Sequence, residues 1–211
     1  MRIPFAREGY PFVLISLVPL VASYLWAPVW VWGFFLALTI FVVAFFRDPE
    51  RVVPDGADVI VSPADGLVIK CEEVFEDRLL KAKALKISIF MNVFNVHVNR
   101  TPADGKVIEV KYNPGKFFNA SFDKASLENE QNALLIESAV NGKRFVVNQI
   151  AGLVARRIVC YSKPGTELKK GERFGIIRFG SRLDVYLPTD AKPAVKIGEK
   201  VRAGSSILAR W

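Results

Sequence analysis

Ser181, the single histidine and an aspartate are the strongest candidates for acid–base or nucleophilic chemistry in this 211-residue sequence. His97 is the only histidine, so an imidazole that transfers protons near neutral pH must be this one. A serine nucleophile needs a base to take its proton and an acidic group to orient that base. Asp65 and Asp104 are both candidates for the acidic group, and spacing does not choose between them.

Ser181 follows Gly180 in a segment whose apolar residues alternate on both sides, which predicts one β-strand running through the Gly-Ser step. Glycine weakens strand pairing and often marks a bulge or a close backbone approach, so a bulge beside a surface serine is the simplest interpretation. The local sequence R-F-G-S-R is not a G-x-S-x-G elbow, which argues against an α/β-hydrolase.

His97 lies in the segment FNVHVNR, for which we predict a strand. On a strand its side chain shares a face with Asn95 and Asn99, and a lone histidine in such a place is more often structural than catalytic. The sequence has no second histidine for a His-rich metal site. Cys71 and Cys160 are far apart in strand-like segments, so we expect reduced thiols and no metal.

The sequence after Phe46 reads as many short strands separated by turn signals, which is typical of an all-β sandwich or barrel. Its closing segment, VKIGEKVRAGSSILA, has the pattern of the half-motifs that build lipoyl- and biotinyl-type barrel-sandwich domains. A polar window at residues 122–133 suits a helix or a loop. The predicted strands are residues 59–61, 66–71, 85–90, 93–98, 106–112, 133–138, 144–150, 153–161, 175–179, 183–187, 194–197 and 206–209.

Residues 10–46 contain no Asp, Glu, Lys, Arg or His, and this run is just short of two membrane crossings. Pro28 would divide it into helices at 12–26 and 29–46, a hairpin or re-entrant anchor. Arginines flank both ends, which predicts a cell-membrane protein with both ends of the run, and so the domain that follows it, on the cytoplasmic face. A signal peptide or a helical hairpin buried in a soluble core is less favoured. We therefore expect an anchor at 1–46 and a β-rich domain at 47–211.

The net charge of +8 and the pI near 9.6 are typical of proteins that bind nucleic acid or an anionic membrane surface. The sequence has no nucleic-acid motif, so with an anchor present the membrane is the favoured partner. One internal echo is also present, SPADGLVI at 62–69 and TPADGKVI at 101–108. Turn chemistry alone explains its prolines and glycines, and either aspartate could simply stabilise its turn.

Several motifs in order resemble one known family, the short bacterial and archaeal phosphatidylserine decarboxylase proenzymes, from about Phe46 to the end of the chain. The motifs are F-R-D-P-x-R, S-P-A-D-G, V-H-V-N-R, the segment GKFFNASFDKASLENEQN, and F-G-S-R ahead of V-Y-L-P.

The resemblance implies that the chain cuts its own Gly180-Ser181 bond. Asp65 would orient His97, His97 would deprotonate Ser181, and the alkoxide would attack the carbonyl of Gly180. Elimination and hydrolysis would then leave a large chain, 1–180, and a small chain, 181–211, blocked by a pyruvoyl group. That group would form a Schiff base with phosphatidylserine and act as electron sink while CO2 leaves and phosphatidylethanolamine forms. The family pattern matches the first P-A-D-G copy, which favours Asp65 over Asp104.

The resemblance also suggests further residues and partners. Asn129 and Glu130 would contact the headgroup, in a segment that otherwise reads as a solvated loop. Phe94 stands where longer members resemble one another in having a second histidine, so that histidine's proton-donor role does not transfer. The family favours a homodimer and no metal. Arg47 and Arg51 would mainly set the membrane topology.

Two rival hypotheses stay open. One is a membrane-tethered carrier or adaptor with a lipoyl-like barrel-sandwich domain and Lys124 as its modified lysine, although the polar SLENEQN that follows is unlike a lipoyl hairpin. The other is a structural membrane-anchored β protein. Cleavage after residue 180 separates both from the decarboxylase.

Overall fold

The computed structural model describes residues 4–115, 129–152, 157–178 and 181–211. The chain forms two compact units, Met1–Glu50 and Arg51–Trp211. Within the first unit, Phe5 and Arg47 form an antiparallel bridge.

The first unit is a pair of apolar helices, α1 (Tyr10–Trp26) and α2 (Val29–Phe45), after a short 3-10 helix, η1 (Arg7–Gly9). Pro28 separates the two helices, as the sequence predicts. Ala27, which precedes it, has a ψ of 161°, the extended conformation that a following proline favours.

The helical pair exposes much of its apolar surface. Trp26 is 82% exposed, while Thr39 Oγ1 donates a hydrogen bond of 3.3 Å to the Ser16 carbonyl and links the helices. Among the described residues, the stretch Arg7–Trp26 is long and apolar enough to cross a membrane, judged by length and composition, and Val29–Phe45 is a shorter apolar helix. Soluble monomers rarely expose an apolar surface of this extent.

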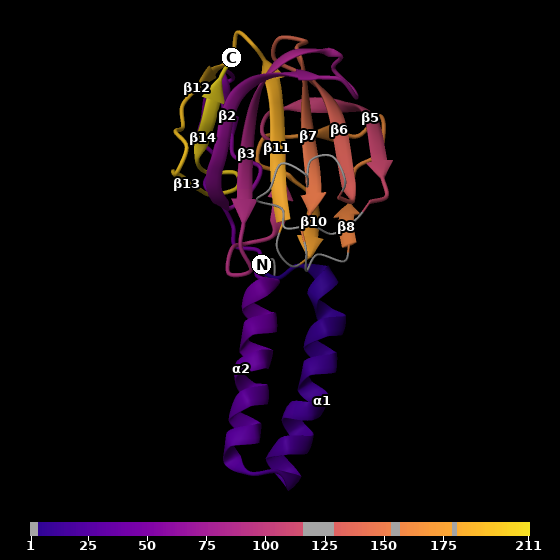
Figure 1. Cartoon of the computed structure of the whole chain (residues 1–211), viewed down its shortest axis with the longest axis vertical. Helices are drawn as coiled ribbons and strands as arrows, with labels where there is room; N and C mark the ends of the chain where they lie inside the picture. Colours follow the sequence, from indigo (N-terminus) through magenta and orange to yellow (C-terminus); the bar gives the residue numbers. More distant parts are fainter. Residues whose placement is uncertain (1–3, 116–128, 153–156, 179–180) are drawn as a thin grey trace. The chain divides into compact units, whose positions relative to one another are not determined.

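The second unit consists of antiparallel strands in three sheets (Figure 1). The largest sheet has the order β13-β2-β3-β11-β7-β6-β5-β9, and the smaller ones have the orders β1-β14-β12 and β4-β10-β8. The strands of the large sheet are β2 (Gly66–Glu76), β3 (Ala82–Met91), β5 (Gly105–Asn113), β6 (Gln131–Ser138), β7 (Arg144–Ala151), β9 (Glu167–Leu168), β11 (Ser181–Pro188) and β13 (Lys200–Val201). The strands of the smaller sheets are β1 (Val59–Val61), β4 (Val98–Arg100), β8 (Arg157–Cys160), β10 (Arg173–Arg178), β12 (Lys192–Pro193) and β14 (Ile207–Arg210).

Strand β11 lies between β3 and β7 in the large sheet (Figure 1). Leu183, Val185 and Leu187 are fully buried in the main apolar core of the β unit. The first five residues of β11 are all buried, so both faces of the strand are covered there.

The strand predicted to run through the Gly-Ser step is in fact two strands in different sheets. β10 ends at Arg178 and pairs with β4 and β8, whereas β11 begins at Ser181 and pairs with β3 and β7. Gly180 lies outside the described residues. The prediction of one strand is wrong because apolar alternation continues through both strands and carries no sign of a change of sheet.

Most other predicted strands are found within a few residues of their expected bounds. The strand predicted at 93–98 is a turn and an irregular segment followed by β4, and the one predicted at 194–197 is absent. The two-residue strands β9, β12 and β13 were not predicted, because pairing with other strands defines such short pieces. The mainly β class with an N-terminal helical pair is confirmed, and the lipoyl-like detail stays a prediction.

Candidate active site

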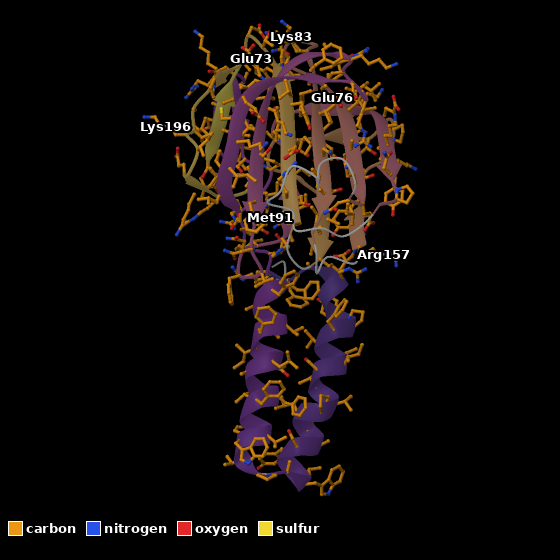
Figure 2. All side chains as sticks on the ribbon, in the orientation of Figure 1. Glu73, Glu76, Lys83, Met91, Arg157 and Lys196 are labelled. Carbon is orange, nitrogen blue, oxygen red and sulfur yellow. The ribbon has the colours of Figure 1, made fainter. Side chains whose placement is uncertain are left out.

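Ser181 is the first residue of β11 and is fully buried. The antiparallel register sets it between Met91 of β3 and Ala151 of β7. Figure 2 shows Met91 at one end of the β unit and Glu73 and Lys83 at the other, so β11 begins at the Met91 end. Within the described ranges the Ser181 Oγ has no hydrogen-bond partner. A buried hydroxyl without a partner costs stability. Ser88 of β3 shares this property, so Ser181 is a functional candidate also because of its place in the motif F-G-S-R.

His97 lies just before β4, and its side chain is fully buried. Its Nδ1 is 2.9 Å from the carbonyl oxygen of Asn95. Because a carbonyl only accepts, this contact assigns the proton to Nδ1 and leaves the lone pair of the neutral ring on Nε2. Nε2 is therefore the ring nitrogen that can act as a base.

A hydrogen-bonded turn at residues 92–95 supplies the carbonyl that orients His97. The Asn92 amide donates to Asn95 Oδ1 at 2.9 Å, and the Phe94 amide donates to Asn92 Oδ1 at 2.9 Å. Phe94 is 71% exposed. The turn therefore orients the histidine and at the same time presents an aromatic ring to solvent.

Asn99 of β4 connects the histidine segment to the strands beside Ser181. Its Nδ2 is 3.9 Å from Met91 Sδ, and its Oδ1 accepts a hydrogen bond of 2.8 Å from Gln149 Nε2. Asn99 and Gln149 are both fully buried. Because Met91 pairs with Ser181 and Asn99 closely follows His97, the fold brings the segments of the predicted base and nucleophile into one buried region.

The Asp65 carboxylate is held by two donors. Oδ2 accepts a hydrogen bond of 2.8 Å from Arg51 Nη2, and Oδ1 accepts one of 2.7 Å from the Ala203 amide. Arg51, for which the sequence suggested only a topological role, thus forms an ion pair with a predicted catalytic residue. The predicted contact between Asp65 and His97 stays a prediction.

Asn129 and Glu130 lie beside Ala151, the residue opposite Ser181. Asn129 Nδ2 donates to the Ala151 carbonyl at 2.7 Å, and the Ala151 amide donates to the Glu130 carbonyl at 3.0 Å. Tyr112 Oη donates to Glu130 Oε1 at 3.0 Å. Burial and this hydrogen bond raise the pKa of Tyr112, so the phenol stays a neutral donor. Residues 116–128, with most of the predicted polar segment and Lys124, lie outside the described ranges.

Metal ions and free thiols are two further sources of chemistry that a site in the described part of the chain could use. No group of three or more His, Cys, Asp or Glu side chains gathers there to hold a metal ion. Cys71 and Cys160 are free and half-buried. Burial raises the pKa of both thiols, which makes them poor nucleophiles.

Sequence reasoning missed two charged contacts near the site. The first is the Arg51–Asp65 ion pair, whose partners come from a segment before β1 and a turn after it. The second is Arg182 with Asp184, both fully buried in β11. The only sequence signal for the second was an Arg and an Asp placed two residues apart in an otherwise apolar strand.

Comparison with known proteins gives one consistent result. A family model described as phosphatidylserine decarboxylase matches residues 38–209. A phosphatidylserine decarboxylase proenzyme of Cupriavidus taiwanensis is 52% identical over 210 residues, covering 97% of this chain and 94% of the relative. A protein of the same name from Ralstonia nicotianae is 54% identical, covering 97% of this chain and 94% of the relative. One from Syntrophus aciditrophicus is 50% identical, covering 98% of this chain and 97% of the relative. The resemblance seen in the motifs is confirmed, and this chain belongs to the phosphatidylserine decarboxylase family.

Proposed function

We propose that this chain is a phosphatidylserine decarboxylase that cuts its own backbone between Gly180 and Ser181 and converts Ser181 into a pyruvoyl group. The buried Ser181 hydroxyl carries the proposal, because it has no hydrogen-bond partner within the described residues and directly follows Gly180 in the motif F-G-S-R. Membership of a family whose relatives are named proenzymes supports the same function.

In the proposed cleavage, His97 Nε2 accepts the Ser181 Oγ proton, and Asp65 is the acidic group that supports the histidine. Oγ attacks the Gly180 carbonyl carbon, and the acyl group moves from nitrogen to oxygen as the nitrogen takes up a proton. A base then removes the Cα proton of residue 181 as the Gly180 carboxylate leaves, which gives dehydroalanine. Water hydrolyses the dehydroalanine with loss of ammonia. The products are the chains 1–180 and 181–211.

The surroundings of Ser181 suit a pyruvoyl group. The ladder between Met91 and Ala151 fixes the backbone of position 181, and this position is fully buried. The pyruvoyl group, once formed, supplies an electron sink for decarboxylation of an amino acid. Phe94 has no titratable group, so we assign proton transfer near position 181 to His97 Nε2.

We propose that Asn129, Glu130 and Phe94 contact the substrate. Glu130 is a buried carboxylate beside Ala151, where it can pair with the ammonium group of a serine headgroup. The Asn129 amide fixes the Ala151 backbone next to that place. The exposed Phe94 ring offers an apolar surface to the acyl part of a phospholipid.

We place the protein in the cell membrane through α1 and α2, with the catalytic unit on the cytoplasmic face and acting on phospholipid there. The exposed apolar helices and the flanking arginines support this placement. The net charge of +8 favours an anionic membrane. We further propose that the protein acts as a homodimer and needs no metal ion.

Intact-mass spectrometry of the full-length protein in detergent tests the self-cleavage. The wild type should give two chains whose masses sum to the precursor plus water minus ammonia, and it should release CO2 from phosphatidylserine. Ser181→Ala and His97→Ala should each stay as one uncut, inactive chain, because each removes a group that takes part in the first step.

Ser88→Ala is the matched control. Ser88 is another fully buried serine of the large sheet whose Oγ has no hydrogen-bond partner within the described residues. This variant should cut and decarboxylate like the wild type. Efficient cleavage of the Ser181→Ala protein would refute the mechanism.

A further inference from the structure

The face of β11 opposite to Ser181 carries a buried ion pair. Side chains alternate along a strand, so Arg182 and Asp184 point away from the face that Ser181 and Leu183 occupy. Arg182 and Asp184 are both 0% exposed. Arg182 Nη2 donates to Asp184 Oδ2 at 2.9 Å, and Arg182 Nε lies 2.8 Å from Asp184 Oδ1. The guanidinium therefore contacts both oxygens of the carboxylate.

Lys86 of β3 adds a third charge. Its Nζ lies 3.4 Å from Asp184 Oδ2 and 5.7 Å from the centre of the Tyr186 ring, which is its partner in the ladder. Burial, and then the nearby Asp184 charge, raise the pKa of Tyr186, so this ring stays neutral beside the ammonium. This buried charged cluster joins β11 to β3. We call it the ionic pin, and it consists of Arg182, Asp184 and Lys86.

Stability alone does not account for the ionic pin. Desolvation offsets much of the attraction between buried charges, and apolar residues of similar volume often serve equally well or better. Buried charges can instead make one strand register more favourable than the others. A slip of β11 by one residue would turn Arg182 and Asp184 toward the core that Leu183 and Val185 now fill. Charges without partners there would be costly, so the ionic pin selects one register.

We infer that the ionic pin fixes the register of β11 so that position 181 stays in place after the backbone is cut. The inference rests on the proposed self-cleavage. Before the cut, the chain holds β11 at both ends. After the cut, β11 starts at position 181, and its pairing with β3 and β7 together with the ionic pin holds that end in place. Arg182, Asp184 and Lys86 are thus positioning residues that act through position 181.

The test uses the full-length protein in detergent with Lys86→Met, Arg182→Met and Asp184→Leu combined. The combined variant should fold with a Tm at or above that of the wild type. Its kcat for phosphatidylserine should fall about 10-fold or more with KM within about 2-fold, because displacing a reacting group by 1 Å can cost about 100-fold. In hydrogen exchange, amides 182–184 of the cut protein should exchange faster than in the cut wild type.

Lys143→Met combined with Asp190→Leu is the matched control. These residues form an exposed ion pair, and Asp190 lies just past the other end of β11. Cleavage, kcat, KM and exchange of amides 182–184 should all match the wild type.

Each outcome decides the inference. A cut triple variant with wild-type kcat and wild-type exchange would overturn it and leave the self-cleavage intact. A wild type that never cuts would overturn the proposed function and the inference with it. If the triple variant does not fold, the Arg182→Lys variant tests the inference instead, because it keeps the positive charge and loses the bidentate contact with Asp184. A lower kcat with unchanged KM and Tm supports the ionic pin, and a wild-type kcat contradicts it.

Discussion

The two copies of P-A-D-G, at residues 63–66 and 102–105, form turns of similar construction. In each turn the aspartate Oδ1 accepts a backbone amide from a distant loop, Ala203 for Asp65 at 2.7 Å and Lys170 for Asp104 at 2.8 Å. In each turn the glycine starts a strand of the large sheet, β2 in the first copy and β5 in the second.

The two turns differ in the other oxygen of the aspartate. Asp65 Oδ2 pairs with Arg51, and both side chains are nearly buried, 13% and 12% exposed. The Pro63 carbonyl of the same turn accepts the amide of Arg100, which ends β4 close after the histidine. Turn chemistry therefore accounts for what the copies share, and the partners around the first copy make Asp65 the better candidate for catalysis.

The largest expected effect is the difference in cleavage rate between the Asp65→Asn and Asp104→Asn variants. Asp65→Asn should slow cleavage after residue 180 by up to about 10⁴-fold, the usual cost of losing the carboxylate that supports the histidine of a Ser-His-Asp set. Asp104→Asn should cut at the wild-type rate. Both variants should stay folded, because the amide oxygen can still accept the backbone hydrogen bond. Time-resolved mass spectra measure both rates, and equal rates would remove the functional difference between the turns.

Gly66→Ala and Gly105→Ala should each destabilise the protein. A Cβ would lie 2.2 Å from the Phe90 carbonyl oxygen at the first glycine and 2.5 Å from the Glu137 carbonyl oxygen at the second. We expect each substitution to lower the free energy of unfolding by about 1–3 kcal/mol, because the neighbouring strand would have to move. Urea titration of uncut protein in the Ser181→Ala background measures it.

Gly33→Ala is the control for the two glycine variants. A Cβ at Gly33 has no atom within 4 Å, so the urea midpoint of the β unit should not change. If alanine were tolerated at position 66 or 105 without loss, the two turns would not require glycine for close strand approach.

Arg51→Gln should have the smallest effect. Asp65 would keep the Ala203 hydrogen bond and lose only the positive charge of its nearly buried ion-pair partner. Cleavage should slow by about 3–10-fold in the same assay, well short of the Asp65→Asn effect. Lys170 is the matching residue of the second turn, because its amide donates to Asp104 and its Nζ donates to the Gly56 carbonyl. Lys170→Gln should leave the cleavage rate unchanged. An Arg51→Gln protein as slow as Asp65→Asn would show that the arginine, and not the carboxylate alone, is required.

The sequence by itself determined the parts of this protein that local chemistry controls. Pro28 divides the helical pair because proline forces the preceding residue out of the helical conformation. Apolar alternation and turn residues placed most strands within a few residues. The single histidine and the order of the motifs gave the candidate residues and the family.

Only the tertiary structure decided that β10 and β11 belong to different sheets, that the Asn95 carbonyl orients His97, and that Arg51 pairs with Asp65. It also decided that Arg182 and Asp184 are buried together. Sheet membership and ion pairing depend on which distant strands meet. Periodicity reports only the face a side chain takes, so these features follow from contacts between segments far apart in the chain.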